Sequence, residues 1–281
     1  MKSTTSKSRW LNWLVILVSF AFTFENSVAE TRDVLRVAAD PNNLPFSNQR
    51  GEGFENKIAQ VIARELHCKL EYHWHAQRRG FFRETLKSGD VDLIIGVPAH
   101  FDLALTTRPI YRSTYVFVTR DDRQLHLGSL DDPQLHKLRI GVQLIGNDGV
   151  DTPPAHALAV RGIIENVRGY TLYGDYTREN PPAQIMDAVR NGDVDVAIVW
   201  GPLAGFFAKQ SRVPLVITPV EPQEDHALRF AFDIAMGVQK ENQRLKEKID
   251  SVLVAHHQEI ERILDAYNVP RVGAGPKGVS L

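Results

Sequence analysis

The sequence predicts an α/β protein of two similar lobes, each a mostly parallel sheet flanked by helices, with the lobes joined by a two-strand hinge. One observation is that strand and helix patterns alternate through both halves of the chain. Another is an internal repeat, in which residues 86–96 (LKSGDVDLIIG) match residues 189–199 (VRNGDVDVAIV). Each copy is a helix end, a glycine stop, Asp-Val-Asp and an apolar strand, so the chain holds two copies of one α/β unit.

The first copy begins with a short apolar strand at 34–39, followed by a loop with two prolines and two asparagines. Apolar residues at helical spacing predict a helix from 53 to 67, which Glu55 opens as a partner for the helix dipole. A strand near 69–75, a helix near 78–87 and a strand at 91–96 complete the unit. Successive apolar strands separated by helices are typical of a covered parallel sheet.

The second copy follows the same order. Its predicted elements are a strand at 138–142, a helix at 154–167 opened by prolines, a strand at 169–173, a helix at 183–189 and a strand at 194–200.

Two extended runs, 115–119 and 215–220, leave the first and second units and are expected to be the crossovers between the lobes. A strand at 230–238 and a long amphipathic helix at 245–264 would then return to the first lobe. Two strands joining two lobes form a hinge of the kind that closes around a ligand. The expected divisions are a signal peptide (1–29), the first part of lobe 1 (30–119), lobe 2 (120–220), the return to lobe 1 (221–270) and a tail (271–281).

The N-terminus has the layout of a secretory signal. Lys2, Lys7 and Arg9 precede an apolar run over residues 10–24, and the small residues of 27–29 (SVA) offer a cleavage site after Ala29. The alternative, an uncleaved membrane anchor, is disfavoured because the run is shorter than the ~20 residues of a spanning helix. We therefore expect a cleaved protein in the periplasm, with no stable membrane insertion.

Composition excludes several functions. With 33 Lys+Arg against 34 Asp+Glu, the chain has no charge excess to hold nucleic acid. Its one cysteine, Cys68, has no internal disulfide partner. The sequence contains no Gly-x-Ser-x-Gly, His-Glu-x-x-His, phosphate-loop or Rossmann motif, and no Cys-x-x-Cys-His haem signature. Its ten histidines do not occur at spacings that complete a tetrahedral metal site. We expect no enzymatic activity, no cofactor and no metal.

The order of elements resembles the type II periplasmic binding-protein fold of solute-binding protein family 3, over residues 33–270. A narrower resemblance is to the quinoprotein-dehydrogenase-associated binding proteins of the MoxJ/XoxJ type. The segments that carry it are residues 39–48 (ADPNNLPFSN), 51–57 (GEGFENK), 96–99 (GVPA) and 105–118 (LTTRPIYRSTYVFV). This resemblance implies a periplasmic protein that serves a methanol or alcohol dehydrogenase using pyrroloquinoline quinone (PQQ), with that enzyme and its cytochrome as partners.

One position departs from the amino-acid-binding members of this fold. They carry an arginine seven residues after the glycine that ends the third strand, where it grips the ligand's carboxylate. Counted from Gly96, that position is Leu103. The sequence therefore predicts no tight binding of amino acids.

Ligands of open α/β sheets bind beyond the carboxyl ends of the strands. This rule selects candidate residues for a ligand or partner cleft: Asp40, Asn42, Asn43, Phe46, Pro98, Arg108, Tyr111, Gln143, Asn147, Asp148 and Trp200. Asp40 and Asn42 have an alternative interpretation, because such residues beside proline also cap turns. Phe46 would alternatively cover the core.

Three functional hypotheses follow. The first is an accessory protein of a PQQ-dependent dehydrogenase, holding a small molecule or a part of the enzyme in its cleft. The second is the substrate-binding component of an ABC importer for a small polar metabolite. The third is an enzyme on the same scaffold.

Overall fold

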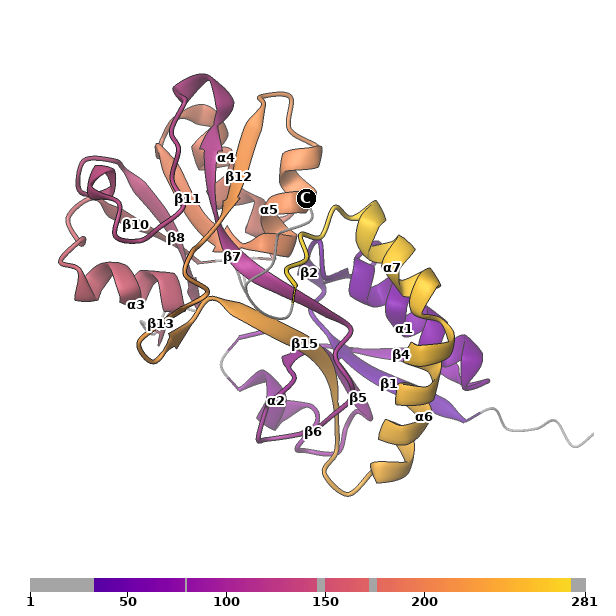
Figure 1. The fold of residues 1–281 in the computed structure, drawn as a ribbon. Coiled ribbons are helices and arrows are strands. Elements are labelled where there is room, and N and C mark those ends of the chain that lie inside the picture. The colour runs from indigo at the N-terminus through magenta and orange to yellow at the C-terminus, as the bar shows by residue number, and fades with distance from the viewer. Residues whose placement is uncertain (1–32, 79, 146–149, 172–175, 274–281) are drawn as a thin grey trace, which may run out of the picture. The chain divides into compact units, whose positions relative to one another are not determined.

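The computed structural model describes residues 33–78, 80–145, 150–171 and 176–273, all within one compact unit, Arg32–Leu281 (Figure 1). The expected signal peptide (1–29), residues 274–281 of the expected tail, and Asn147 and Asp148 lie outside the described residues. Among the helices that are described, none is long and apolar enough to cross a bilayer.

The two-lobed α/β fold predicted from the sequence is confirmed. The first lobe consists of β1 (Val34–Ala39), β2 (Asn42–Asn43), β3 (Ser47–Asn48), α1 (Phe54–Glu65), β4 (Lys69–Trp74), α2 (Phe81–Glu84), β5 (Leu93–Pro98), β6 (Leu105–Thr106), β15 (Ala231–Val238), α6 (Gln243–Ala255) and α7 (His257–Ala266). Strands β4, β1 and β5 lie parallel in that order, and β15 pairs antiparallel with β5. Helices α1, α6 and α7 pack together (Figure 1), so the C-terminal segment returns to the first lobe as expected.

The second lobe has the same arrangement. Its elements are β8 (Ile140–Ile145), β9 (Val150–Asp151), α3 (Pro153–Val160), β10 (Val167–Thr171), α4 (Gln184–Asn191), β11 (Val196–Trp200), α5 (Gly201–Lys209), β12 (Leu215–Pro219), β13 (Glu224–Asp225) and β14 (Leu228–Arg229), with short 3-10 turns at Asp121–Arg123, Pro133–His136 and Pro181–Ala183. Strands β10, β8 and β11 are parallel. Val196 and Ile198 of β11 enter one apolar core and Ala197 and Val199 the other, so the strand is buried on both faces.

The hinge consists of β7 (Tyr111–Arg120) and β15, and it differs in one part from the expectation. The start of β7 pairs with β15, and its end pairs with β11 and β12. The prediction that residues 215–220 cross between the lobes is wrong, because β12 stays beside β7 in the second lobe. The chain instead returns through the β13–β14 hairpin and β15. Strand β15 was predicted only to return the chain to the first lobe, but it is also the second strand of the hinge.

Local backbone conformation explains why two predicted helices differ from those observed. Helix α3 stops at Val160, ahead of the predicted end at 167, and Gly162 follows with φ of 71°. That left-handed backbone is natural for glycine and turns the chain out of the helix. The helix predicted at 245–264 is two helices, because His256 takes a non-helical conformation (φ −109°, ψ 21°) between α6 and α7.

The sequence repeat corresponds to an arginine–aspartate salt bridge that occurs at the first strand of the sheet in each lobe. Asp92 accepts the backbone N–H of Arg36 at 2.9 Å and its guanidinium at 2.8 Å. Asp195 does the same for Arg139, with both distances 2.9 Å, and each pair is separated by 56 residues. A two-pronged pair with an added backbone bond fixes where the first strand of each lobe enters its sheet.

Helix α5 of the second lobe is braced against the chain that follows α7. Asn268 donates its side-chain amide to the carbonyl of Gly205 at 3.1 Å, and the Phe206 and Tyr267 rings stack with centroids 5.6 Å apart. A Cβ on Gly205 would lie 1.9 Å from the backbone oxygen of Asn268. Glycine is therefore the residue that lets these two backbones touch, and the lobes are joined here as well as through the hinge strands.

Candidate functional site

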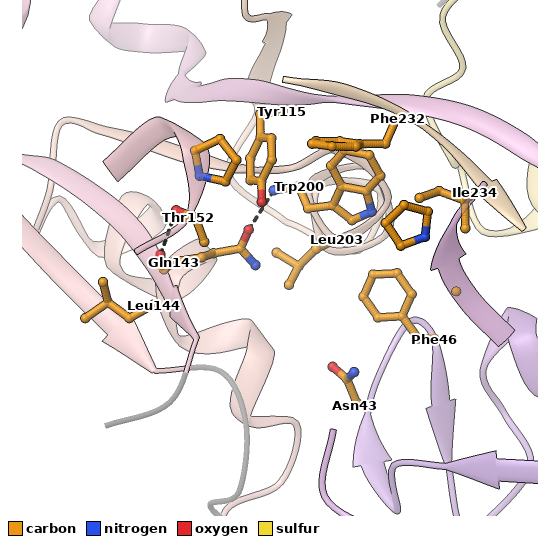
Figure 2. Close-up of a pocket in the computed structure, with 13 residues that line it drawn as sticks. Asn43, Phe46, Tyr115, Gln143, Leu144, Thr152, Trp200, Leu203, Phe232 and Ile234 are labelled. Atoms are coloured by element: carbon orange, nitrogen blue, oxygen red, sulfur yellow. Dashed lines mark hydrogen bonds between the residues drawn. The ribbon is translucent and has the colours of Figure 1, made fainter. Parts of the chain in front are cut away.

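A cleft of about 310 Å³ lies at the carboxyl ends of the strands of both lobes (Figure 2). The residues that line it are Asn43, Phe46, Gly96, Pro98, Tyr115, Gln143, Leu144, Thr152, Pro153, Trp200, Leu203, Phe232 and Ile234. None of these thirteen side chains is charged at neutral pH. Their chemistry suits binding by apolar contact with a few directed hydrogen bonds, and includes no evident acid, base or thiol nucleophile.

Aromatic rings form one wall of the cleft. The Trp200 ring meets Tyr115 with centroids 5.3 Å apart and Phe232 with centroids 6.0 Å apart, both nearly edge to face. This geometry is the favourable one for paired aromatic rings. Tyr115 and Trp200 are register partners on β7 and β11, and Phe232 lies on β15, so the wall is built on the hinge strands themselves.

Gln143 orients Trp200. Its side chain is only 6% exposed, and its Oε1 accepts the backbone N–H of Trp200 at 2.7 Å (Figure 2). The Gln143 carbonyl accepts the hydroxyl of Thr152 at 2.9 Å. A hydrogen bond from the Trp200 side chain to Tyr111 holds the other end. These bonds fix the tryptophan at the junction between β11 and α5.

Five of the residues predicted from the sequence come together in this lining: Asn43, Phe46, Pro98, Gln143 and Trp200. Asn43 is buried and donates its side-chain amide to Gln77 at 3.0 Å. Phe46 packs on Phe54 of the core, with centroids 5.4 Å apart, while also facing the cleft. Phe46 therefore both covers the core of the first lobe and forms part of the cleft wall.

Asp40 and Asn42 lie outside this lining and join two loops. The Asp40 carboxylate accepts the backbone N–H groups of Asn42 (2.8 Å) and Gln77 (2.7 Å) and the hydroxyl of Tyr176 (3.3 Å). Burial raises the pKa of Asp40, and these hydrogen bonds oppose the rise. Asn42 donates to the carbonyl of Arg178 at 2.8 Å. The turn-capping interpretation describes the bond between Asp40 and the Asn42 N–H, whereas the bonds to Tyr176 and Arg178 join residues 136 positions apart.

Three other positions lie away from the cleft lining. Tyr111 is in the first-lobe core, where burial raises its pKa well above the usual value. Arg108 lines a separate hollow with Leu253 and His257, and its backbone N–H donates to Asp250 at 2.7 Å. Leu103 is 56% exposed and also lies outside the lining. Leu103 therefore does not line this cleft, and none of the described lining residues is an arginine that could bind an amino acid's carboxylate.

The sequence analysis missed the hinge-strand residues of the cleft. Tyr115 lies in a predicted crossover and Phe232 in the strand predicted to return to the first lobe, although alternation along a strand puts every second side chain on one face. Leu203 follows Trp200 on α5, and Thr152 and Pro153 open α3. The prolines at the start of α3 could have indicated that Thr152 and Pro153 lie at the cleft, because they mark where that helix begins.

Gly96 and Glu55 meet beneath the cleft. Gly96 forms a bulge in β5, with φ of 86°. On β15, Ala235 pairs with Val97 and Met236 with Ile95, so Gly96 has no partner. A Cβ there would lie 2.4 Å from Oε1 of Glu55. Glu55 is 8% exposed, and burial raises its pKa to about 8. Near neutral pH its carboxyl is therefore mostly protonated, a state that lacks the negative charge expected of a partner for the helix dipole.

Among the residues that the structure describes, no group of three or more His, Cys, Asp or Glu side chains is arranged to hold a metal ion.

Two α/β lobes, crossed by a pair of hinge strands and enclosing a cleft at their strand ends, are the architecture of a type II periplasmic binding protein. The chain belongs to the bacterial extracellular solute-binding proteins, family 3, which it matches over residues 35–269.

Relatives within this family share most of the chain. Protein MoxJ of Methylorubrum extorquens AM1 is 32% identical over 250 residues, which cover 84% of this chain and 81% of that protein. The crystal structure of the periplasmic binding protein XoxJ from Methylobacterium extorquens AM1 has 38% identity and a TM-score of 0.70, covering 86% of this chain and 100% of that one. MxaJ from Methlophaga aminisulfidivorans MPT, at 23% identity and a TM-score of 0.71 over 85% and 100% of the two chains, shares the fold. The protein is thus MoxJ-like.

Proposed function

We propose that the protein is a periplasmic accessory of a PQQ-dependent methanol or alcohol dehydrogenase system, which it aids by holding a ligand or a part of the enzyme in its cleft. The observation that carries the proposal is the likeness to MoxJ and XoxJ along more than four fifths of the chain. The cleft supports this proposal over an importer of small polar metabolites, because its uncharged, aromatic lining suits an apolar group better than a polar metabolite. The dehydrogenase and its cytochrome are the proposed partners.

Deletion of the gene is expected to lower dehydrogenase activity in the periplasm, because the accessory step would be lost. The wild-type gene should restore it, and Phe46→Leu and Trp200→Leu should restore it poorly. Arg108→Ala is the matched control, since Arg108 lies outside the cleft lining. Only variants with a melting temperature close to the parent's are compared. Full dehydrogenase activity in the deletion strain would contradict the proposal, and loss of metabolite uptake in its place would support the ABC-importer alternative.

We further propose export by the N-terminal signal, with cleavage after Ala29. The expected result is a periplasmic protein that begins at Glu30, measured by the intact mass of the exported chain. Recovery of the uncleaved chain in the membrane fraction would contradict this.

A further inference from the structure

We infer that the cleft recognises an uncharged aromatic group, supplied either by a small molecule or by an aromatic side chain of a bound polypeptide. This inference rests on the proposed function, since it names the chemistry of what that same cleft holds. It is carried by four aromatic side chains and two amide side chains of a lining in which none of the described residues is charged.

The uncharged lining selects against ions. An ammonium or carboxylate group transferred from water into such a cleft would lose its hydration with no opposite charge to replace it. Two charged side chains already have ionic or hydrogen-bond partners, although the buried Nε of Arg112 has none among the described residues. The Asp40 carboxylate is bonded to two backbone N–H groups and to Tyr176, and Arg112 is paired with Asp233 at 3.0 Å.

The carboxyl group behind Gly96 is also mostly neutral near pH 7. Glu55 lies behind Gly96, and the titratable groups that face it are the phenols of Tyr72 and Tyr111, both with pKa values raised by burial. The cleft therefore presents no full charge from this side near neutral pH.

The aromatic wall supplies the attraction. Trp200, Tyr115 and Phe232 are held edge to face, which leaves ring surface toward the cleft, and Phe46 lies across from them (Figure 2). A guest ring gains both apolar burial and ring pairing, the latter about 0.5–1.5 kcal/mol in comparable pairs. The amides of Asn43 and Gln143 provide uncharged polar groups at the cleft, suited to a single polar substituent on the guest. A volume of about 310 Å³ limits the guest to a small ring system.

The test compares probes that share a ring and differ in charge. Binding of N-acetyl-tryptophanamide, free tryptophan, indole and N-acetyl-leucinamide to the mature protein is measured by calorimetry and by the shift in melting temperature. The blocked tryptophan is expected to bind at least about tenfold more tightly than free tryptophan, and more tightly than the blocked leucine. Comparable binding of indole would indicate a free small molecule as the natural guest. Binding of the blocked amide alone would indicate a polypeptide segment.

Two variants test the wall. Trp200→Leu and Phe46→Leu keep an apolar side chain and remove an aromatic ring, so each should weaken binding of the blocked tryptophan by about tenfold, while Arg108→Ala leaves it unchanged. The inference is overturned if free tryptophan binds as well as its blocked form, if the leucine probe matches the tryptophan probe, or if no aromatic probe binds in the millimolar range. None of these outcomes would contradict the proposed function, which is tested separately by dehydrogenase activity in the deletion strain.

Discussion

Replacing Gly205 by alanine is expected to lower the free energy of unfolding by about 3 kcal/mol, the upper part of the range for forced overpacking. The added Cβ would lie 1.9 Å from the backbone oxygen of Asn268 and 3.0 Å from Pro270, so α5 or the C-terminal segment must move. Backbone that is hydrogen-bonded on both sides cannot move aside as a flexible side chain does. In an ordinary helix the same change would instead stabilise, by about 1 kcal/mol.

The measurement is denaturant unfolding at equilibrium. Gly128→Ala is the matched control, because the nearest atom to its added Cβ is a Thr218 methyl at 3.9 Å. That variant should be neutral or slightly more stable. If the Gly205→Ala and Gly128→Ala proteins unfold at the same denaturant concentration, the close contact between α5 and the C-terminal segment is not present in solution.

Replacing Glu55 by glutamine is expected to flatten the dependence of stability on pH. Burial raises the pKa of Glu55 from 4.5 to about 8, so between these pH values the folded state keeps a proton that the unfolded state has released. Stability is therefore highest below pH 4.5 for this group and falls as pH rises through 8. Glutamine has no proton to release. Relative to the parent, the variant should gain about 4 kcal/mol between pH 5 and 8.5, taking 1.36 kcal/mol per pKa unit.

The experiment measures the free energy of unfolding of both proteins across that pH range. Glu241→Gln, at an exposed position, controls for the loss of a carboxylate as such. Curves for the parent and for Glu55→Gln that stay parallel from pH 5 to 8.5 would show that the buried carboxyl is ionised in the folded protein, contrary to the expectation.

The sequence was informative about the fold because apolar periodicity and the repeated Gly-Asp-Val-Asp turn are local features. It placed β5 and β11 correctly, and the same rule of strand ends found Asn43, Phe46, Pro98, Gln143 and Trp200 in the cleft. Each of these residues lies in or just after a strand whose direction is set by its own lobe.

The remaining parts depend on contacts that are distant in sequence. Residues 215–219 pair with β7 and do not cross between the lobes. Strand pairing of this kind depends on distant residues and cannot be predicted from a local pattern. Arg108 is held beside α6 by a bond from its backbone to Asp250, 142 residues later. Glu55 has a sequence position typical of an exposed helix start, and only the packing of the core over it determines its burial.

The double crossing of the chain also sets the order in which the protein can be completed during synthesis. The elements from β7 to β12 are contiguous, so the main sheet of the second lobe has all its strands once residue 219 is made, and only the β13–β14 hairpin of that lobe follows. The first lobe starts earlier but lacks β15 and the helices over α1 until residues 231–266 follow. Its apolar strand β5 has no β15 neighbour in that interval, and unpaired strand edges of this kind are prone to association between chains. The lobe that begins the chain is thus the last to have all its strands and helices available, and its incomplete form is the one that exposes an unpaired edge of β5.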